Sequence, residues 1–336
     1  MTPLLLDPVV TVAVPALAVE VEVAGALVAR SPDTGLARTL EVPRGRVAVG
    51  ADVGRGGGVF RVTAVRSTTA DGYFGIDGEA WVAEVDLAAA ELRVPELGAR
   101  VQAGMVPDLW SAGSEDAWGH GALWTNPGEA FGWMDRSDLG GFVAWNGWEQ
   151  RVGAAVALTS GEGANWRERN EGMNLAGAVQ VAPWGPPVRL TLYGRNGSRG
   201  LGLVRDHRLG ARVDGRTDQV SWGAEVLQAW GVDGDATRAP TGGSGWATVR
   251  PWGPTVAVAR VDLTTEALAD PAAGTFGWLG AAGVGWDDGA VDLLLGAAQT
   301  RRGAAAAAIA GADALALETR FFVQLDVHLS VSTRSP

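Results

Sequence analysis

The stretch from Leu315 to Val331 constrains the fold more than any other part of the chain. Its odd-numbered positions are all apolar except Thr319, whereas its even-numbered positions include Glu318, Arg320 and Asp326. Strict alternation with a period of two predicts a β-strand with one apolar and one polar face. The strand would be roughly three times as long as the ordinary strand of about 5–6 residues. A soluble sheet seldom needs such length, but a tilted strand that crosses a bilayer does.

The same alternation recurs along the chain and predicts about sixteen strands in total, with apolar residues on one face and polar residues on the other. The predicted strands before the last one are 17–30, 46–52, 59–66, 80–87, 97–105, 139–146, 151–159, 174–182, 188–195, 208–213, 220–230, 246–250, 255–263, 276–286 and 291–300.

The connections between these strands alternate in length. Long connections follow the odd strands, at 31–38, 67–78, 106–138, 161–173, 196–206, 231–245, 264–274 and 301–313, and short turns follow the even ones. Bacterial outer-membrane barrels have long extracellular loops and short periplasmic turns in this order. The sequence therefore predicts an all-β protein, a transmembrane antiparallel up-and-down β-barrel in one domain. Residues 1–16 are expected to be a periplasmic N-terminal segment, and 332–336 a C-terminal tail.

Composition excludes several other classes of protein. The 336 residues include 49 glycines, 15 tryptophans and no cysteine, and the formal net charge is −11. Without cysteine the chain has neither a disulfide framework nor a thiolate metal site. Its acidic balance and its lack of a basic stripe argue against nucleic acid as a partner. The residues after Met1 lack a basic segment and are interrupted by Asp7 and Pro8, so we do not expect a signal peptide there.

Catalytic chemistry has no recognisable signature in the sequence. The three histidines, His120, His207 and His328, are far apart, and no nucleophile-elbow, phosphate-loop or zinc-protease motif occurs. We therefore expect no enzyme activity, no cofactor and no bound metal.

Tryptophan spacing supports a membrane barrel. Trp222 and Trp230 lie eight residues apart on one strand face, and so do Trp278 and Trp286. On a tilted strand this separation rises roughly 20 Å, close to the ~25 Å between the aromatic girdles at the two bilayer interfaces. We expect these four residues to form the membrane girdle. The alternative is that they fill a core or stack on sugars.

The polar faces of the predicted strands would line the lumen. They carry arginines and carboxylates in similar numbers, which suits a field across the lumen that orients polar solutes. The alternative is that these charges only pair across strands. The predicted lumen-lining residues are Arg61, Glu84, Asp86, Arg100, Arg151, Arg189, Arg195, Arg260, Asp262 and Arg320.

The third long connection, residues 106–138, is called the third loop below. It shows no clear period, and it is rich in acidic residues. A loop that folded into the barrel would place these carboxylates opposite the arginines of the wall and constrict the lumen. The alternative is a surface lid or a contact with a neighbouring subunit. The residues expected at the constriction are Asp108, Glu115, Asp116, Asp135 and Arg136.

Several short segments resemble one known family. AWVAEVDL from residue 80 is followed by LGARVQAGMVPDL, and RSDLGGFVAWNG, GAAVALTSGEGAN and ARVDL occur later in the chain. These segments are similar to the paired strands of the phosphate-selective porin O/P family. The resemblance implies a channel-forming barrel of sixteen strands that is usually trimeric. Two features depart from the family: the chain contains no lysine, which the family associates with phosphate selectivity, and its last strand lacks the usual terminal aromatic residue.

Three functions fit these observations. The first is an outer-membrane porin for passive diffusion of small polar or ionic solutes. The second is a non-channel barrel with a structural or assembly role, and the third is a soluble all-β glycan-binding protein. The first implies a bacterial outer-membrane location, contact with outer-membrane lipid and lipopolysaccharide, small ions or solutes as ligands, and a homo-oligomer, a trimer by resemblance.

Overall fold

The structure is a computed structural model. It describes residues 16–31, 37–69, 78–119, 127–130, 132–149, 151–161, 172–185, 187–265, 276–287, 291–301 and 317–332. Residues 1–15 and 333–336 lie outside this part of the chain, and with them most of the expected N-terminal segment and C-terminal tail. None of the helices among the described residues is long and apolar enough to cross a bilayer.

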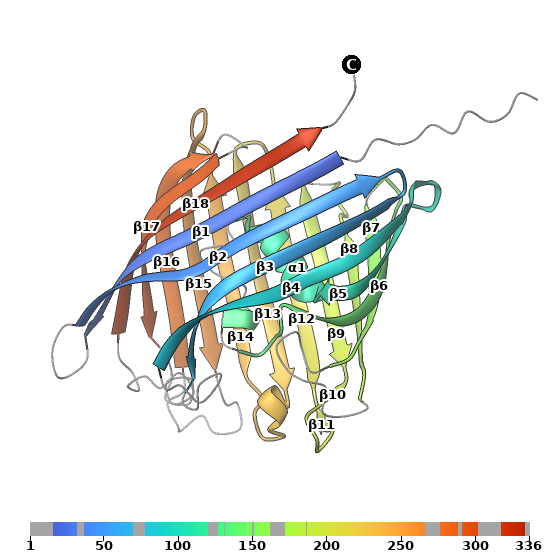
Figure 1. Cartoon of the computed structure of the whole chain (residues 1–336), viewed down its shortest axis with the longest axis horizontal. Helices are drawn as coiled ribbons and strands as arrows, with labels where there is room; N and C mark the ends of the chain where they lie inside the picture. The colour runs from blue at the N-terminus through green and yellow to red at the C-terminus, as the bar shows by residue number, and fades with distance from the viewer. Residues whose placement is uncertain are drawn as a thin grey trace, which may run out of the picture.

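Sixteen of the described strands form one closed antiparallel barrel, as the alternating pattern predicted (Figure 1). Each of these strands pairs with the strands before and after it in the ring. The strands are β1 (Ala16–Ser31), β2 (Ala37–Val53), β3 (Gly56–Thr69), β4 (Gly78–Val94), β5 (Ala99–Pro107), β6 (Ser137–Gly147), β7 (Val152–Thr159), β8 (Asn174–Val181), β9 (Val188–Asn196), β12 (His207–Arg216), β13 (Val220–Trp230), β14 (Thr241–Val249), β15 (Thr255–Thr265), β16 (Phe276–Asp287), β17 (Val291–Arg301) and β18 (Leu317–Ser332).

The first and last strands close the ring. β1 pairs with β18 along its whole length, from Leu17 opposite Val331 to Arg30 opposite Glu318. Because a bilayer offers no hydrogen-bond partners to the backbone, a barrel must pair both edges of its sheet. The predicted pairing of the first strand with the long last strand is therefore confirmed.

Long and short connections alternate around the barrel, as predicted. The short turns gather at the upper end in Figure 1, where β1 begins and β18 ends side by side. The third loop contains two helices, α1 (Leu109–Trp118) and α2 (Pro127–Ala130), which the sequence pattern did not indicate. The connection after β9 contains a small hairpin of β10 (Ser198–Arg199) and β11 (Val204–Arg205), which was also not predicted.

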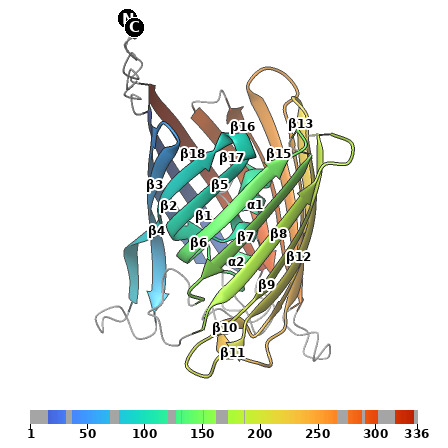
Figure 2. The ribbon, with the colours of Figure 1, turned by 90° about the vertical axis from the view of Figure 1, so that its right-hand side faces the viewer.

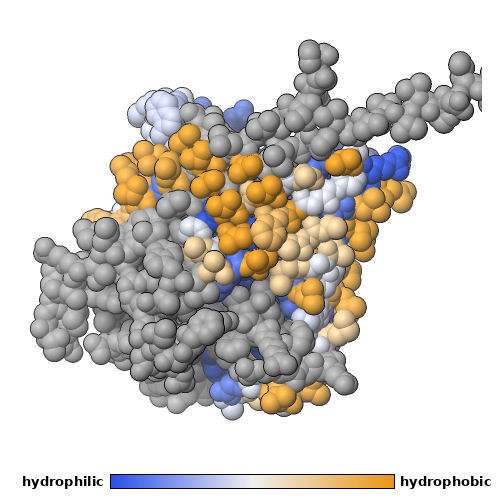
Figure 3. Space-filling model, viewed as in Figure 1, coloured by the Kyte–Doolittle hydropathy of each residue, from blue (hydrophilic) through white to orange (hydrophobic). Residues whose placement is uncertain are grey.

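The apolar face of the strands points outward. On β18, Phe321, Val323 and Leu325 are 53%, 49% and 41% exposed, whereas Phe322 and Gln324 between them are buried. Figure 3 shows apolar side chains spread over one outer face of the barrel. A soluble protein does not expose apolar residues over such an area. The outer surface is that of a transmembrane barrel, and the alternative of a soluble glycan-binding protein is wrong.

A β-bulge corrects one predicted strand face. The register of β3 and β4 shifts where Arg61 pairs with Leu87 and Val62 pairs with Val85, so Asp86 is the extra residue. The bulge puts Asp86 and Leu87 both on the buried side, although the alternation predicted Leu87 on the lipid face. Beyond the bulge the odd positions of β4 face inward, which brings Ala89 into the interior.

Several strand ends also differ from the prediction. β2 begins at Ala37 instead of residue 46, β4 ends at Val94 instead of residue 87, and β14 begins at Thr241 instead of residue 246. β5 begins at Ala99 instead of residue 97, because Pro95–Leu97 forms a 3-10 turn that ends at Gly98 with φ 62°. Arg151 belongs to the turn before β7.

A charged side chain on the outer face should destabilise the barrel in a bilayer. Ala282, which is midway between Trp278 and Trp286, pairs with Ala297, and Ala297 pairs with Phe321. Phe321 thus lies within the apolar band. We expect Phe321→Arg to destabilise the barrel in lipid vesicles by up to about 2–4 kcal/mol, because the cost of an arginine on the lipid face is largest at the bilayer midplane. Urea unfolding monitored by tryptophan fluorescence would measure this change.

The matched control is Leu201→Arg, because Leu201 is 81% exposed between β10 and β11, outside the barrel strands. Equal stability of the Phe321 variant and this control would contradict the assignment of the outer face.

Candidate functional site

Residues at the two ends of α1 determine where this helix of the third loop begins and ends. Asp108 is the N-cap of α1, and its carboxylate accepts hydrogen bonds from the backbone N–H groups of Trp110 at 2.9 Å and Ser111 at 3.1 Å. Gly119 ends the helix with φ 77°, a left-handed conformation that glycine adopts without strain. The cap therefore fixes where α1 leaves the barrel wall.

Three consecutive residues of α1 contact different walls of the barrel. The Ser114 hydroxyl donates to Glu225 on β13 at 2.7 Å. Glu115 accepts from Arg46 on β2 at 3.3 Å, and Asp116 accepts from Arg189 on β9 at 3.5 Å. Around the ring, six strands separate β2 from β13 on one side and eight on the other. The helix therefore lies inside the barrel, as Figure 2 also shows, and its contacts cross the interior.

Aromatic rings of α1 pack under arginines of the wall. The Arg212 guanidinium lies 5.3 Å from the Trp110 ring centroid, and that of Arg260 lies 5.4 Å from the Trp118 ring centroid. Both tryptophans are almost fully buried. Cation–π contacts of this kind strengthen when water is excluded. Arg260 also donates to Asp262 at 2.8 Å, so this charged pair lies beneath the loop.

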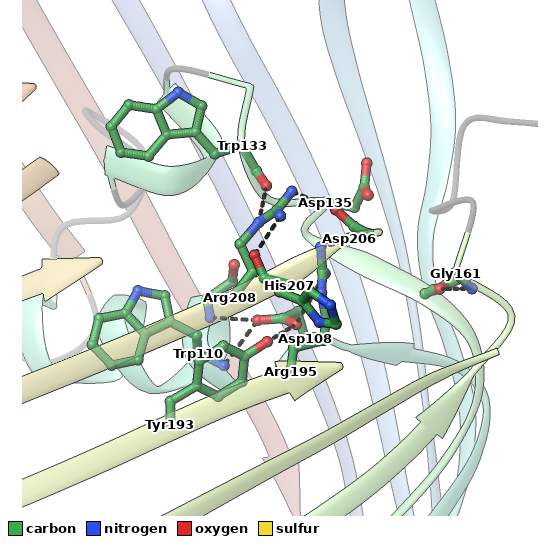
Figure 4. A network of polar contacts seen from close by, with 12 residues as sticks. Asp108, Trp110, Trp133, Asp135, Gly161, Tyr193, Arg195, Asp206, His207 and Arg208 are labelled. Carbon is green, nitrogen blue, oxygen red and sulfur yellow. Dashed lines mark hydrogen bonds and ion pairs between the residues drawn. The ribbon is translucent and has the colours of Figure 1, made fainter. Parts of the chain in front are cut away.

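The segment that enters α1 is anchored by a buried polar network (Figure 4). The Tyr193 hydroxyl donates to Asp108 at 3.0 Å, and the Arg195 guanidinium lies 3.8 Å from the same carboxylate. Arg195 also donates to Asp206 at 2.6 Å, and Asp206 lies 2.7 Å from Arg208. Burial raises the pKa of Asp108, against the lowering effect of Arg195. Its ionised form therefore depends on these donors.

The segment that leaves the helices is held by three arginines. Arg208 donates its Nε–H to the Trp133 carbonyl at 2.8 Å. Arg199 lies 2.8 Å from Asp135. Arg136 lies 3.2 Å from Asp86 on β4.

Burial and neighbouring charges shift two pKa values in this segment. Burial raises the pKa of Asp135, against the lowering effect of Arg199. Burial lowers the pKa of Arg136, but the carboxylates of Glu129, Glu115 and Asp86 raise it more, so it lies above its ordinary value.

The predicted lumen-lining residues fall into three groups. Arg195, Arg260 and Asp262 are buried and in contact with the third loop or with partners beneath it. The remaining described members are paired, half-buried or exposed, and of these Asp86 and Arg189 also contact the third loop. Arg320 has a side chain outside the described residues. The paired or half-buried members are Arg61, Glu84, Asp86 and Arg189, and the exposed ones are Arg100 and Arg151.

The third-loop residues predicted at the constriction have different exposures. Asp116 is the most exposed, at 71%, whereas Asp108 and Glu115 are largely buried. Asp135 and Arg136 belong to the segment that returns to β6. The sequence did not indicate which wall residues contact them, such as Arg46 for Glu115 and Tyr193 for Asp108, because alternation identifies a strand face but not the residue that covers it.

The predicted girdle tryptophans lie on the outer surface where their side chains are described. Trp222 and Trp230 are each 39% exposed and Trp286 is 51% exposed, while the Trp278 side chain lies outside the described residues. The prediction missed three tryptophans at short turns, Trp148, Trp184 and Trp252, which are 74–75% exposed. A repeated Pro-Trp-Gly-Pro motif at 183–186 and 251–254 could have revealed two of them.

Known structures share this fold. An anion-selective porin from Comamonas acidovorans aligns with a TM-score of 0.64 at 10% identity, over 94% of this chain and 100% of that chain. OmpF of Salmonella typhi, in a complex with daunomycin, aligns at 0.63 with 10% identity, over 92% of this chain and 97% of that chain. OprB of Pseudomonas putida aligns at 0.53 with 10% identity, over 95% and 93%. No protein-family model and no curated protein sequence matches the chain.

These alignments define the class of the protein by its fold. The chain has the barrel of the outer-membrane porins, and a bacterial outer-membrane location accords with that fold. At 10% identity the likeness concerns the fold alone. Among the described residues no three histidine or acidic side chains are grouped to hold a metal ion.

The contact of α1 with the far wall can be tested by a double-mutant cycle. Arg46 and Glu115 are 6% and 17% exposed, so we expect a coupling of about 1–3 kcal/mol between Arg46→Met and Glu115→Gln in the free energy of unfolding. The control is the exposed pair Arg55 and Glu96, for which coupling should not exceed about 1 kcal/mol. Equal coupling in the two pairs would show that α1 is not held against β2.

Proposed function

We propose that the protein is an outer-membrane porin through which small polar or ionic solutes diffuse passively. The observation that carries the proposal is the position of α1, which lies inside the barrel and has polar contacts with β2, β9 and β13. This segment places charged residues inside the lumen. A charged constriction of this kind selects among solutes by size and charge.

The exposed charges near α1 identify the part of the loop that solutes would meet. Asp116 is largely exposed and lies 3.5 Å from Arg189, which is 30% exposed. This carboxylate on the loop and guanidinium on the wall form a partly exposed ion pair, whose field acts on solutes that pass beside it. In this proposal Asp116 and Arg189 belong to the constriction, whereas Arg195, Arg260 and Asp262 hold the loop in place.

The proposed solutes are small polar or ionic molecules, with no narrower class. The resemblance to phosphate-selective porins supports a barrel, but the lysines associated with phosphate selectivity are missing from this sequence. A homotrimer, and contact of the outer face with lipid and lipopolysaccharide, are part of the same proposal. They rest on the resemblance and on the apolar outer surface.

A plugged barrel with an assembly role is the second candidate. The observation that favours it is the same crossing of the interior, because Glu115 and Ser114 are adjacent yet contact β2 and β13. If the remaining cross-section is too small for hydrated ions, the barrel does not conduct.

Planar-bilayer recording separates the two candidates. We expect stable conductance steps from the folded protein and a measurable reversal potential in a salt gradient. Asp116→Asn should shift that potential toward anions, because it removes a negative charge from the constriction. The control is Asp235→Asn, which removes an exposed carboxylate between β13 and β14. Persistent silence of folded protein would contradict the porin and support the plugged barrel.

A further inference from the structure

The two ends of the third loop are held through one carboxylate. Asp206 lies immediately before β12, and its side chain is fully buried. One of its oxygens accepts from Arg195 at 2.6 Å, and the other lies 2.7 Å from Arg208. Both arginines are also almost fully buried. Such a group is stable only while its charges remain paired.

Each of these arginines contacts a different end of the third loop. Arg195 lies 3.8 Å from Asp108, the residue that caps α1. Arg208 donates to the Trp133 carbonyl in the returning segment. Figure 4 shows Asp108 and Trp133 on separate stretches of the chain.

A third contact comes from the same connection. Arg199 in β10 lies 2.8 Å from Asp135, two residues after Trp133. The Asp206 backbone N–H donates to the Gly197 carbonyl at 2.9 Å, which ties the hairpin of β10 and β11 to the start of β12. The connection between β9 and β12 thus contacts both the entering and the leaving segments of the third loop.

We propose that Asp206 is the positioning residue of the third loop. Its carboxylate orients Arg195 toward Asp108 and Arg208 toward Trp133, and through them it sets where α1 lies in the interior. Loss of its charge leaves two buried guanidinium groups without their shared partner. Both ends of the loop then loosen together, while the hydrogen-bonded barrel persists. The effect on conductance rests on the proposed porin function, whereas the effect on loop position does not.

The chain offers a clean reporter because it contains no cysteine. Ser111 in α1 is 1% exposed, and its hydroxyl has no hydrogen-bond partner among the described residues. Ser111→Cys therefore adds a single thiol without removing a contact. Thr248 in β14 is likewise 1% exposed with no described partner for its hydroxyl, so Thr248→Cys reports on the barrel wall.

The experiment compares thiol modification rates in the folded protein in detergent. We expect Asp206→Asn to accelerate modification at Ser111→Cys by about tenfold or more, because an unpaired buried charge favours local opening. The rate at Thr248→Cys should not change. The control is Asp287→Asn, which removes a carboxylate paired with Arg250 at 2.7 Å near a short turn. It should leave both rates unchanged.

Two results would overturn the proposal. The first is an unchanged rate at Ser111→Cys in the Asp206→Asn background. The second is an equal rise at Thr248→Cys, which would mean that Asp206 stabilises the whole barrel. If Asp206→Asn does not fold, hydrogen exchange of the unaltered protein decides: the amides of Asp108, Trp133 and Asp206 should exchange in one step, and earlier exchange of the loop amides alone would refute the proposal.

Bilayer conductance tests the porin proposal separately from the positioning role of Asp206. If the porin proposal is right, Asp206→Asn should also increase the open-channel noise in bilayer recordings. If the unaltered protein is silent but the thiol at Ser111→Cys still reacts faster in the variant, the porin proposal fails and the positioning role stands.

Discussion

The structure depends first on the pairing of β1 with β18. Inside a bilayer an unpaired backbone N–H or C=O costs several kcal/mol, so a sheet that spans it has to close. The last strand is long because it must provide backbone hydrogen-bond partners to the strands on both of its sides. It pairs along its whole length with β1 on one side, and from Leu317 to Val327 with β17 on the other. Its outward residues are apolar and exposed, as a lipid-facing surface requires.

Closure creates a second physical problem on the inside. The inward positions of the strands carry many charges, and charges in a confined space need partners. The third loop supplies several of them. Arg46, Arg189 and Arg195 each contact a carboxylate of the loop. Glu225 accepts a hydrogen bond from the Ser114 hydroxyl of the loop. The loop therefore stabilises the interior of the wall as much as the wall positions the loop.

The sequence predicted the barrel well because alternation is a direct consequence of having lipid on one side and water or protein on the other. The number of strands, the order of long and short connections, and the closing pair follow from that period and from turn residues, whereas several strand ends do not. The position of Leu87 did not follow, because a bulge at Asp86 changes the phase of β4 without any change in composition.

The site was less predictable than the fold for a related reason. Alternation places Arg260 and Asp262 on the inward face, but it does not say that Trp118 covers them. The third loop has no amphipathic period that would have indicated α1, because the helix contacts the wall on more than one side. A helix surrounded by wall residues loses the polar face on which periodicity arguments depend.

The same contacts limit how the interior can be used. Ser114 and Glu115 connect α1 to β13 and to β2, which lie far apart in the ring. The helix therefore crosses the lumen at this depth and does not run along its edge. Solutes would have to pass on one side of the helix, near groups that remain exposed to water, such as Asp116. Buried charges contribute little to selectivity because their fields are already compensated by neighbours at 2.6–2.8 Å. In the porin proposed above, selectivity would therefore depend on the few charges that the loop leaves exposed, and not on the number of arginines on the wall.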